Sequence, residues 1–141
     1  MIYKFTIDGR PITKKNSMTK TKYGLIQSKQ YRNYEKAALC QLMTQKPKGF
    51  RAIHCATRMN ARYYLPNRQG WPDLFGLVQA TADILEKAGI IEDDGYIADI
   101  AYSGIAGIDP AWPRVELWVI PMPDDPFNEL HPKLRKKSKN D

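Results

Sequence analysis

The sequence has 141 residues, 43% of them hydrophobic and three of them tryptophan, and it carries a net charge of +7. This length and composition fit one folded domain with its own core, and they exclude both a two-domain chain and a disordered one. The sequence has no apolar run of about 18 residues and no secretory signal, so we expect a soluble, cytoplasmic protein without a membrane span.

Histidine and cysteine are too scarce for a zinc site of the Cys/His type, because the sequence has only two of each. Cys40 and Cys55 lack CxxC spacing, and each lies in an apolar segment, where we expect a small buried side chain. His54 is expected to be a structural or surface histidine rather than a ligand.

The charge is divided unevenly along the chain. Residues 1–68 carry fifteen basic and two acidic side chains, residues 69–123 carry two and nine, and residues 124–141 carry five and four. A basic surface attracts a polyanion, whereas an acidic cluster repels one unless a cation lies between them. The alternative is that the two halves neutralise each other across solvated faces, and charge alone does not decide between these interpretations.

The N-terminal third predicts a strand, a loop and a helix. Residues 2–7 alternate in the manner of a strand, and the polar residues 12–24 lack a hydrophobic period and indicate a loop. Ser28 suits the N-cap of a helix that runs to about Thr44. The loop contributes candidate phosphate contacts, with a solvated hairpin tip as the alternative: Lys14, Lys15, Asn16, Lys20 and Lys22.

Residues 50–66 predict one long strand or a strand pair, with basic side chains on or near its open face. Two of these side chains, Arg58 and Arg62, are candidate nucleic-acid contacts, as is Arg68 in the polar loop that follows. The chain then enters its clearest helical pattern.

Residues 72–88 predict a helix with an apolar stripe formed by Leu74, Leu77, Val78, Thr81, Ile84, Leu85 and Ala88. Pro72 suits its first turn and Gly89 the residue just past its end. Asp73, Asp83 and the pair Asp93–Asp94 lie where such a helix and its return can bring carboxylates to one point. Adjacent side chains on an extended segment diverge, so we expect one of Asp93 and Asp94 to face that point.

The remaining chain predicts strands over residues 96–102 and 114–120, with a loop over residues 104–113 between them. From Asp124 onward it is rich in proline and charge, which indicates a mobile tail. The order of elements predicts an α+β fold: a single domain over residues 1–123 with a mixed sheet packed against two helices, and a flexible tail over residues 124–141.

Converging carboxylates in a basic protein suggest a site for Mg²⁺ or Mn²⁺, because these cations prefer oxygen ligands and leave room for a phosphate oxygen. Paired acidic residues after a helix are common on protein surfaces as well, so the pattern alone is a weak signal.

The central segment resembles the RusA-type Holliday junction resolvases, whose pattern is roughly P-D-x-D-N-L, then D-x-L, then G-x-x-x-D-D. The matching residues keep the spacing of that pattern: Pro72, Asp73, Leu77, Asp83, Leu85, Gly89, Asp93 and Asp94. The early Lys/Asn loop, the helix after Ser28 and the strand over residues 114–120 fall in the order expected of that family.

This resemblance implies a homodimeric, Mg²⁺-dependent endonuclease that nicks four-way DNA junctions in recombination or repair. Such enzymes are often carried on prophages, and if this one is encoded by a bacterium or a phage it would associate with the nucleoid. Carried over by position, Asp73, Asp94 and Asp93 would be catalytic, and Asp73, Asp94 and Asp83 would hold the metal.

Three residues depart from the family pattern. Phe75 stands where the family has its second aspartate, Gly76 stands in place of the asparagine, and Gln79 replaces a lysine; we count Gln79 among the nucleic-acid contacts. The leading hypothesis is therefore a junction-resolving nuclease. The alternatives are a catalytically impaired relative that binds branched DNA without cutting it, and a small interaction protein whose charge asymmetry serves self-association.

Overall fold

The computed structural model describes residues 1–14, 18–21 and 24–136. Its elements are β1 (Tyr3–Asp8), β2 (Met18–Thr21), β3 (Gly24–Gln27), α1 (Lys29–Gln45), β4 (Thr57–Leu65), α2 (Leu74–Lys87), the 3₁₀ turn η2 (Asp94–Tyr96), β5 (Ile97–Asp99), β6 (Gly104–Ile108), β7 (Arg114–Pro121) and α3 (Phe127–Leu130). In this described part of the chain, no helix is both long and apolar enough to span a membrane.

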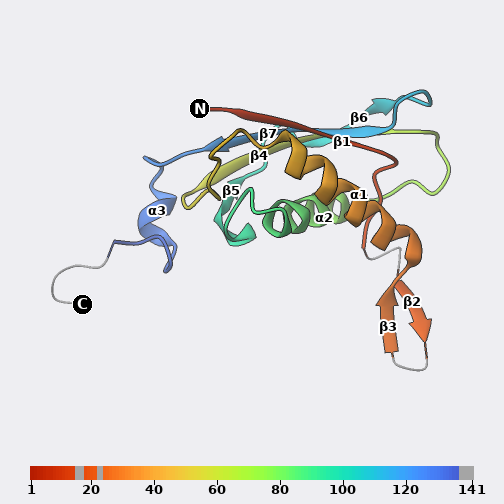
Figure 1. The fold of residues 1–141 in the computed structure, drawn as a ribbon, viewed down its shortest axis with the longest axis horizontal. Coiled ribbons are helices and arrows are strands. Elements are labelled where there is room, and N and C mark those ends of the chain that lie inside the picture. Colours follow the sequence, from red (N-terminus) through yellow and green to blue (C-terminus); the bar gives the residue numbers. More distant parts are fainter. Residues whose placement is uncertain (15–17, 22–23, 137–141) are drawn as a thin grey trace.

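Five strands form one mixed sheet. β7 pairs antiparallel with β1 on one side and with β4 on the other, and both β5 and β6 pair in parallel with the far side of β4. α1 and α2 lie along one face of this sheet, while the β2–β3 hairpin projects from the body (Figure 1). This confirms the predicted α+β domain with a mixed sheet and two packed helices.

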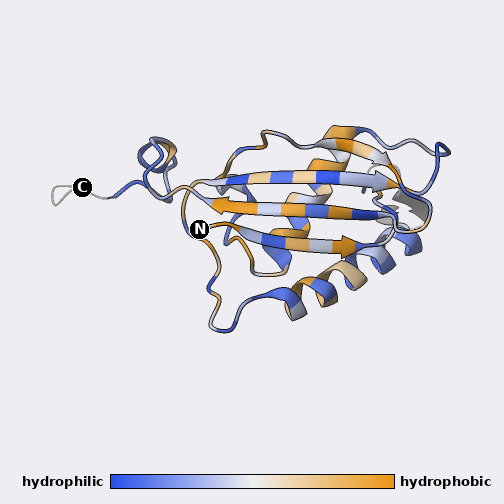
Figure 2. Cartoon of the chain, turned by 90° about the horizontal axis from the view of Figure 1, so that it is seen from above, coloured by the Kyte–Doolittle hydropathy of each residue, from blue (hydrophilic) through white to orange (hydrophobic). Residues whose placement is uncertain are grey.

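Strand β4 shows why the core lies on the helical side. Its nine residues alternate between buried and half-buried, because successive side chains of a strand point to opposite faces. Met59, Ala61 and Tyr63 face the core, where they meet Leu42 of α1 and Ile84 of α2. The same alternation of hydrophobic and hydrophilic residues is visible along the strands in Figure 2.

Helix α1 begins at the predicted cap, since the Ser28 side chain accepts a hydrogen bond from the Tyr31 backbone N–H. Tyr31 is fully buried in the core. Further along the helix, Gln41 and Gln45 hydrogen-bond to the backbone of β1 at Asp8 and Thr6. These two amides lie along the outer edge of β1, with which no other strand pairs in the described part of the chain besides β7 on the opposite side.

Helix α2 begins two residues later than the sequence predicts. Asp73 is its N-cap and accepts a hydrogen bond from the Gly76 backbone N–H, so Pro72 precedes the cap instead of lying in the first turn. Gly89 follows the end with φ of 71°, a left-handed conformation that favours glycine. Inside the core, the Tyr63 hydroxyl lies 2.8 Å from Thr81 Oγ1, which joins α2 to β4.

Two segments differ from the predicted loops. The backbone of residues 18–21 pairs with that of residues 24–27 as a hairpin, although the sequence predicts a loop over residues 12–24. Residues 104–108 form β6, although Gly104 and Gly107 indicate a loop. These three strands, β2, β3 and β6, exist because a partner strand supplies their hydrogen bonds, and the local sequence pattern gives no sign of that partner.

Two predicted strands are shorter than expected. Residues 50–56 contain only an isolated bridge between Ile53 and Ile91, so the strand in this region is β4 alone. The strand predicted over residues 96–102 is reduced to the three residues of β5. Cys40 is exposed rather than buried, because it lies on the outer side of α1, and Cys55 is half-buried.

The segment from Asp124 to Lys136, for which the sequence predicts a mobile tail, folds back onto the domain. The Asn128 side chain accepts a hydrogen bond from the Ala56 backbone N–H at 2.7 Å and donates to Met122 O at 2.9 Å. The His131 ring packs edge-on against the ring of buried Tyr96, with 5.1 Å between centroids. Residues 137–141 lie outside the described residues, and the domain boundary at residue 123 stays a prediction.

Candidate active site

Three carboxylates meet where α2 returns through η2 towards β5. Glu86, Asp93 and Asp94 each offer an oxygen, and these oxygens lie within 4.8 Å of one another. Asp93 and Glu86 are half-buried and Asp94 is exposed. The sequence predicts that one member of the adjacent pair faces this point, and this is wrong: Asp94 begins a 3₁₀ turn instead of continuing an extended segment, so both side chains reach the cluster.

Hydrogen bonds from backbone N–H groups to carboxylate oxygens fix the turn that carries Asp93 and Asp94. Asp93 caps η2, its Oδ1 accepting from the Gly95 backbone N–H at 2.8 Å. Glu86 Oε1 accepts from the Asp94 backbone N–H at 2.9 Å, which ties the turn to the last residues of α2. The positions of the three carboxylates therefore follow from the helix and its return.

The cluster carries an excess of negative charge. Desolvation raises the pKa of Asp94, and the neighbouring carboxylates of Glu86, Asp93 and Asp83 raise it further, against a smaller opposing effect of the Gly95 N–H. A carboxyl group surrounded by like charges resists ionisation. A cation at this point would relieve that repulsion.

Asp83 lies on the flank of α2 and is neutralised by two lysines. Lys14 Nζ lies 2.7 Å and Lys87 Nζ 3.2 Å from Asp83 Oδ2, and Lys87 also lies 3.1 Å from Glu35 of α1. Burial alone would raise the pKa of Asp83, but the hydrogen bonds and charges of Lys14 and Lys87 outweigh it and lower that pKa. Asp83 is thus engaged in a balanced group of two lysines and two carboxylates.

The start of α2 holds the residues that depart from the family pattern. Asp73 is not one of the three clustered carboxylates, and its Oδ1 serves as the helix cap. Phe75 is 82% exposed, so it has no part in the core. A Cβ at residue 76 would approach Asp73 Oδ1 and Thr13 Cγ2 more closely than packing allows, which explains the glycine.

The predicted nucleic-acid contacts are distributed over several surfaces. Arg58 and Arg62 lie on the sheet face away from the core, where Arg58 pairs with Asp99 at 2.9 Å and Arg62 donates to Tyr102 O at 2.9 Å. Arg68 and Gln79 are exposed, on a loop and on α2. Lys15, Asn16 and Lys22 lie outside the described residues, and of Lys20 only the backbone in β2 is described.

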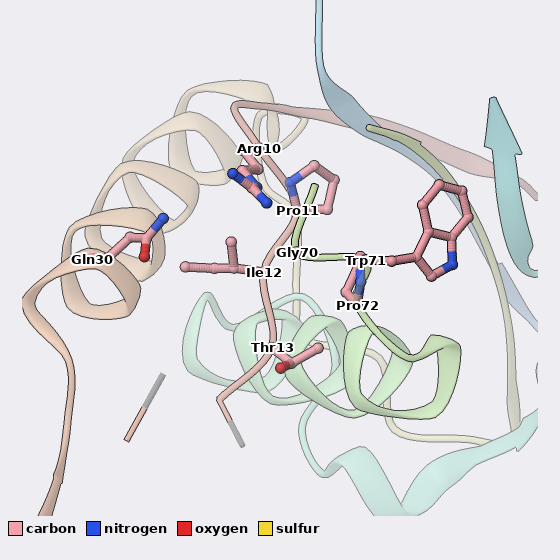
Figure 3. A pocket seen from close by; sticks show the side chains of 8 residues that line it. All are labelled: Arg10, Pro11, Ile12, Thr13, Gln30, Gly70, Trp71 and Pro72. Atoms are coloured by element: carbon pink, nitrogen blue, oxygen red, sulfur yellow. The ribbon is translucent and has the colours of Figure 1, made fainter. Parts of the chain in front are cut away.

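A pocket of about 410 Å³ opens at the N-terminal end of α2. It is lined by Arg10, Pro11, Ile12, Thr13, Gln30, Gly70, Trp71 and Pro72. In Figure 3 the loop after β1 separates Gln30 of α1 from Pro72, and Trp71 points to the opposite side from Gln30. The Arg10 guanidinium is held there by a 2.8 Å hydrogen bond to Gln69 O, so the pocket presents a positive charge.

The cluster fits a hard divalent cation. Carboxylate oxygens are the ligands that Mg²⁺ and Mn²⁺ prefer, and a Mg²⁺ site commonly has few carboxylates and several waters. Glu86, Asp93 and Asp94 supply such oxygens within reach of one another.

Glu86 was not among the residues that the sequence singles out. Its signal is spacing: it lies three residues after Asp83, so the two share one side of the helix. The last turn of α2 therefore carries a second carboxylate, that of Glu86, on the side of the helix that faces Asp93 and Asp94.

The α+β domain thus joins a basic N-terminal half to a carboxylate cluster at the end of α2. The family model Endodeoxyribonuclease RusA matches residues 8–119, and the chain therefore belongs to that family. RusA nucleases are metal-dependent and resolve Holliday junctions, which are four-way branched DNA. A comparison with curated proteins gives no match.

Proposed function

We propose that this protein is a Mg²⁺- or Mn²⁺-dependent endonuclease that nicks four-way DNA junctions in recombination or repair. The observation that carries the proposal is the cluster of Glu86, Asp93 and Asp94 in a chain of the RusA family. The basic N-terminal half supports binding of a polyanion beside these carboxylates.

In this proposal, Asp94, Asp93 and Glu86 hold the cation, and Asp73 and Asp83 remain predicted ligands from the start and flank of α2. The cation would supply a nucleophilic hydroxide and stabilise charge on the phosphodiester. The chain itself orients the carboxylates through the η2 turn and presents Arg10 and Gln79 to the DNA backbone, and Lys14, which pairs with Asp83 in the free protein, remains a predicted contact. Two active sites are needed to nick a junction symmetrically, so the proposed enzyme is a homodimer.

A second candidate function is binding of branched DNA without cleavage. It is favoured by Phe75, which is exposed where the family has its second aspartate, and by the uncharged Gln79. If these residues have removed activity, Phe75→Asp combined with Gln79→Lys should restore cleavage.

The experiment is incubation of purified protein with a labelled four-way junction and, separately, a duplex of the same sequence, with Mg²⁺, with Mn²⁺ and with EDTA. The nuclease predicts metal-dependent nicks in the junction, which the variant Asp94→Asn lacks while still binding. Tight junction binding without nicks would support the second candidate. Equal affinity for junction and duplex at moderate salt would contradict both.

A further inference from the structure

The C-terminal segment brings an ammonium group to the carboxylate cluster. Lys133 Nζ lies 2.6 Å from Asp93 Oδ2, while the other oxygen of Asp93 accepts from the Gly95 N–H. The Lys133 side chain is 65% exposed, so its ammonium also faces solvent. The Lys133 ammonium group therefore lies between the carboxylate cluster and the solvent from which a ligand would approach.

This lysine is positioned by contacts on both sides of it. His131 packs between Phe127 and Tyr96, with ring centroids 5.7 and 5.1 Å away, and Leu134 packs against the core. The Asn128 hydrogen bonds anchor the start of the segment. An exposed ion pair contributes little to stability, so the Lys133–Asp93 contact is not needed to hold the segment in place.

The net charge of the carboxylate cluster indicates a role for the Lys133–Asp93 contact. Three carboxylates and one divalent cation leave one negative charge, which repels a phosphate. Lys14 and Lys87 are engaged by Asp83 and Glu35. Among the described residues, Lys133 is the lysine that an ion pair places on the cluster, and its charge brings the loaded site to neutrality.

We propose that Lys133 is a phosphate-binding residue of the site, which turns from Asp93 towards the DNA backbone when the cluster holds its cation. This inference rests on the proposed function. It makes the C-terminal segment part of the nucleic-acid surface and assigns that role to one positioned lysine instead of to the diffuse charge of the tail.

The test is the salt dependence of binding to a four-way junction, at a low fixed concentration of Ca²⁺ used in place of Mg²⁺. Each phosphate contact contributes about 0.9 to the slope of log K against log salt. Lys133→Gln should reduce the slope by about 0.9 and weaken binding roughly fivefold to tenfold near 0.1 M salt. Lys133→Arg should keep the wild-type slope.

Lys136→Gln is the matched control, because it removes the same charge from the same segment at an exposed residue. It should change the slope by less than half as much. An equal change would show diffuse attraction by the tail and overturn the inference, and so would an unchanged slope in Lys133→Gln.

Asp93→Asn separates phosphate binding from a merely structural ion pair. In EDTA it should tighten junction binding, because it removes a repelling carboxylate and releases Lys133. If the ion pair only held the segment in place, Asp93→Asn and Lys133→Gln would weaken binding alike. Wild-type protein that shows no junction binding would instead contradict the proposed function itself.

Discussion

The side-chain amide of Gln45 makes the two backbone hydrogen bonds that a neighbouring strand would make to Thr6. Gln45 Oε1 accepts from the Thr6 N–H at 2.8 Å, and its Nε2 donates to Thr6 O at 2.7 Å. Gln41, one helical turn earlier, bonds in the same way to Asp8. The exposed edge of β1 is thus covered by α1, which blocks strand pairing with another chain at these residues.

Gln45→Ala should lower the free energy of unfolding by about 1–3 kcal/mol, because two hydrogen bonds are lost and an edge is opened. Denaturant unfolding measures the loss, and size-exclusion chromatography detects edge-to-edge association. Met43→Ala, at an exposed residue of the same helix, is the control. Unchanged stability in Gln45→Ala would mean that water replaces the amide without cost.

The contact between Tyr63 and Thr81 should be a coupled pair. Thr81 Oγ1 donates to Leu77 O at 2.8 Å, so the Tyr63 hydroxyl is the donor to Thr81. Thr81→Val leaves that hydroxyl buried without an acceptor, and should cost about 1–3 kcal/mol. In a double-mutant cycle with Tyr63→Phe, the double variant should lose less than the sum of the single losses. Additive losses would show that the hydroxyls do not interact.

Asp83 should make stability depend on pH in acid. Because Lys14 and Lys87 hold the pKa of Asp83 below its usual value, the ionised group stabilises the fold above about pH 4, and this contribution is lost as the pH falls through the lowered pKa. Asp83→Asn should therefore be less stable than wild type at pH 7, with the difference shrinking towards pH 2. A difference that is independent of pH would point to packing instead of charge.

The ionisation of Asp94 should affect the stability of the fold in the opposite direction. Its pKa is raised, so its ionised form destabilises the metal-free fold at neutral pH, and this cost disappears as the pH falls below the raised pKa. Asp94→Asn should raise the Tm slightly in EDTA at pH 7. Added Mg²⁺ should raise the Tm of wild type, because ligands that bind only the native state stabilise it, and should do so less in Asp94→Asn. A lower Tm for Asp94→Asn in EDTA would show that the carboxylate is held by favourable contacts.

Periodic and capping patterns in the sequence predicted the two helices, with the Ser28 cap of α1 and the Gly89 that follows α2, and the strands β1 and β7. These features depend on neighbours within a few residues, and such neighbours are visible in a sequence. β6 and the β2–β3 hairpin depend on pairing, and polar or glycine-rich stretches give little local sign of it.

The candidate site divides in the same way. The return through Asp93 and Asp94 was predicted from spacing, whereas Glu86 joins them because of the geometry of the η2 turn. Lys133 reaches the cluster because two contacts hold its segment against the domain. The Asn128 side chain hydrogen-bonds to the backbone of Ala56, and the His131 ring packs against the ring of Tyr96. Contacts between residues 35 or more positions apart carry no periodic signal, so a charged, proline-rich segment resembles a free tail.

The most direct test of the proposed function is cleavage of a labelled four-way junction by wild type and by Asp94→Asn, with binding measured on the same samples. We predict paired, symmetric nicks that require Mg²⁺ or Mn²⁺ in wild type, and retained binding without nicks in Asp94→Asn. Wild-type protein that binds the junction but leaves every strand intact with both metals would contradict the assignment of Glu86, Asp93 and Asp94 as a working nuclease site.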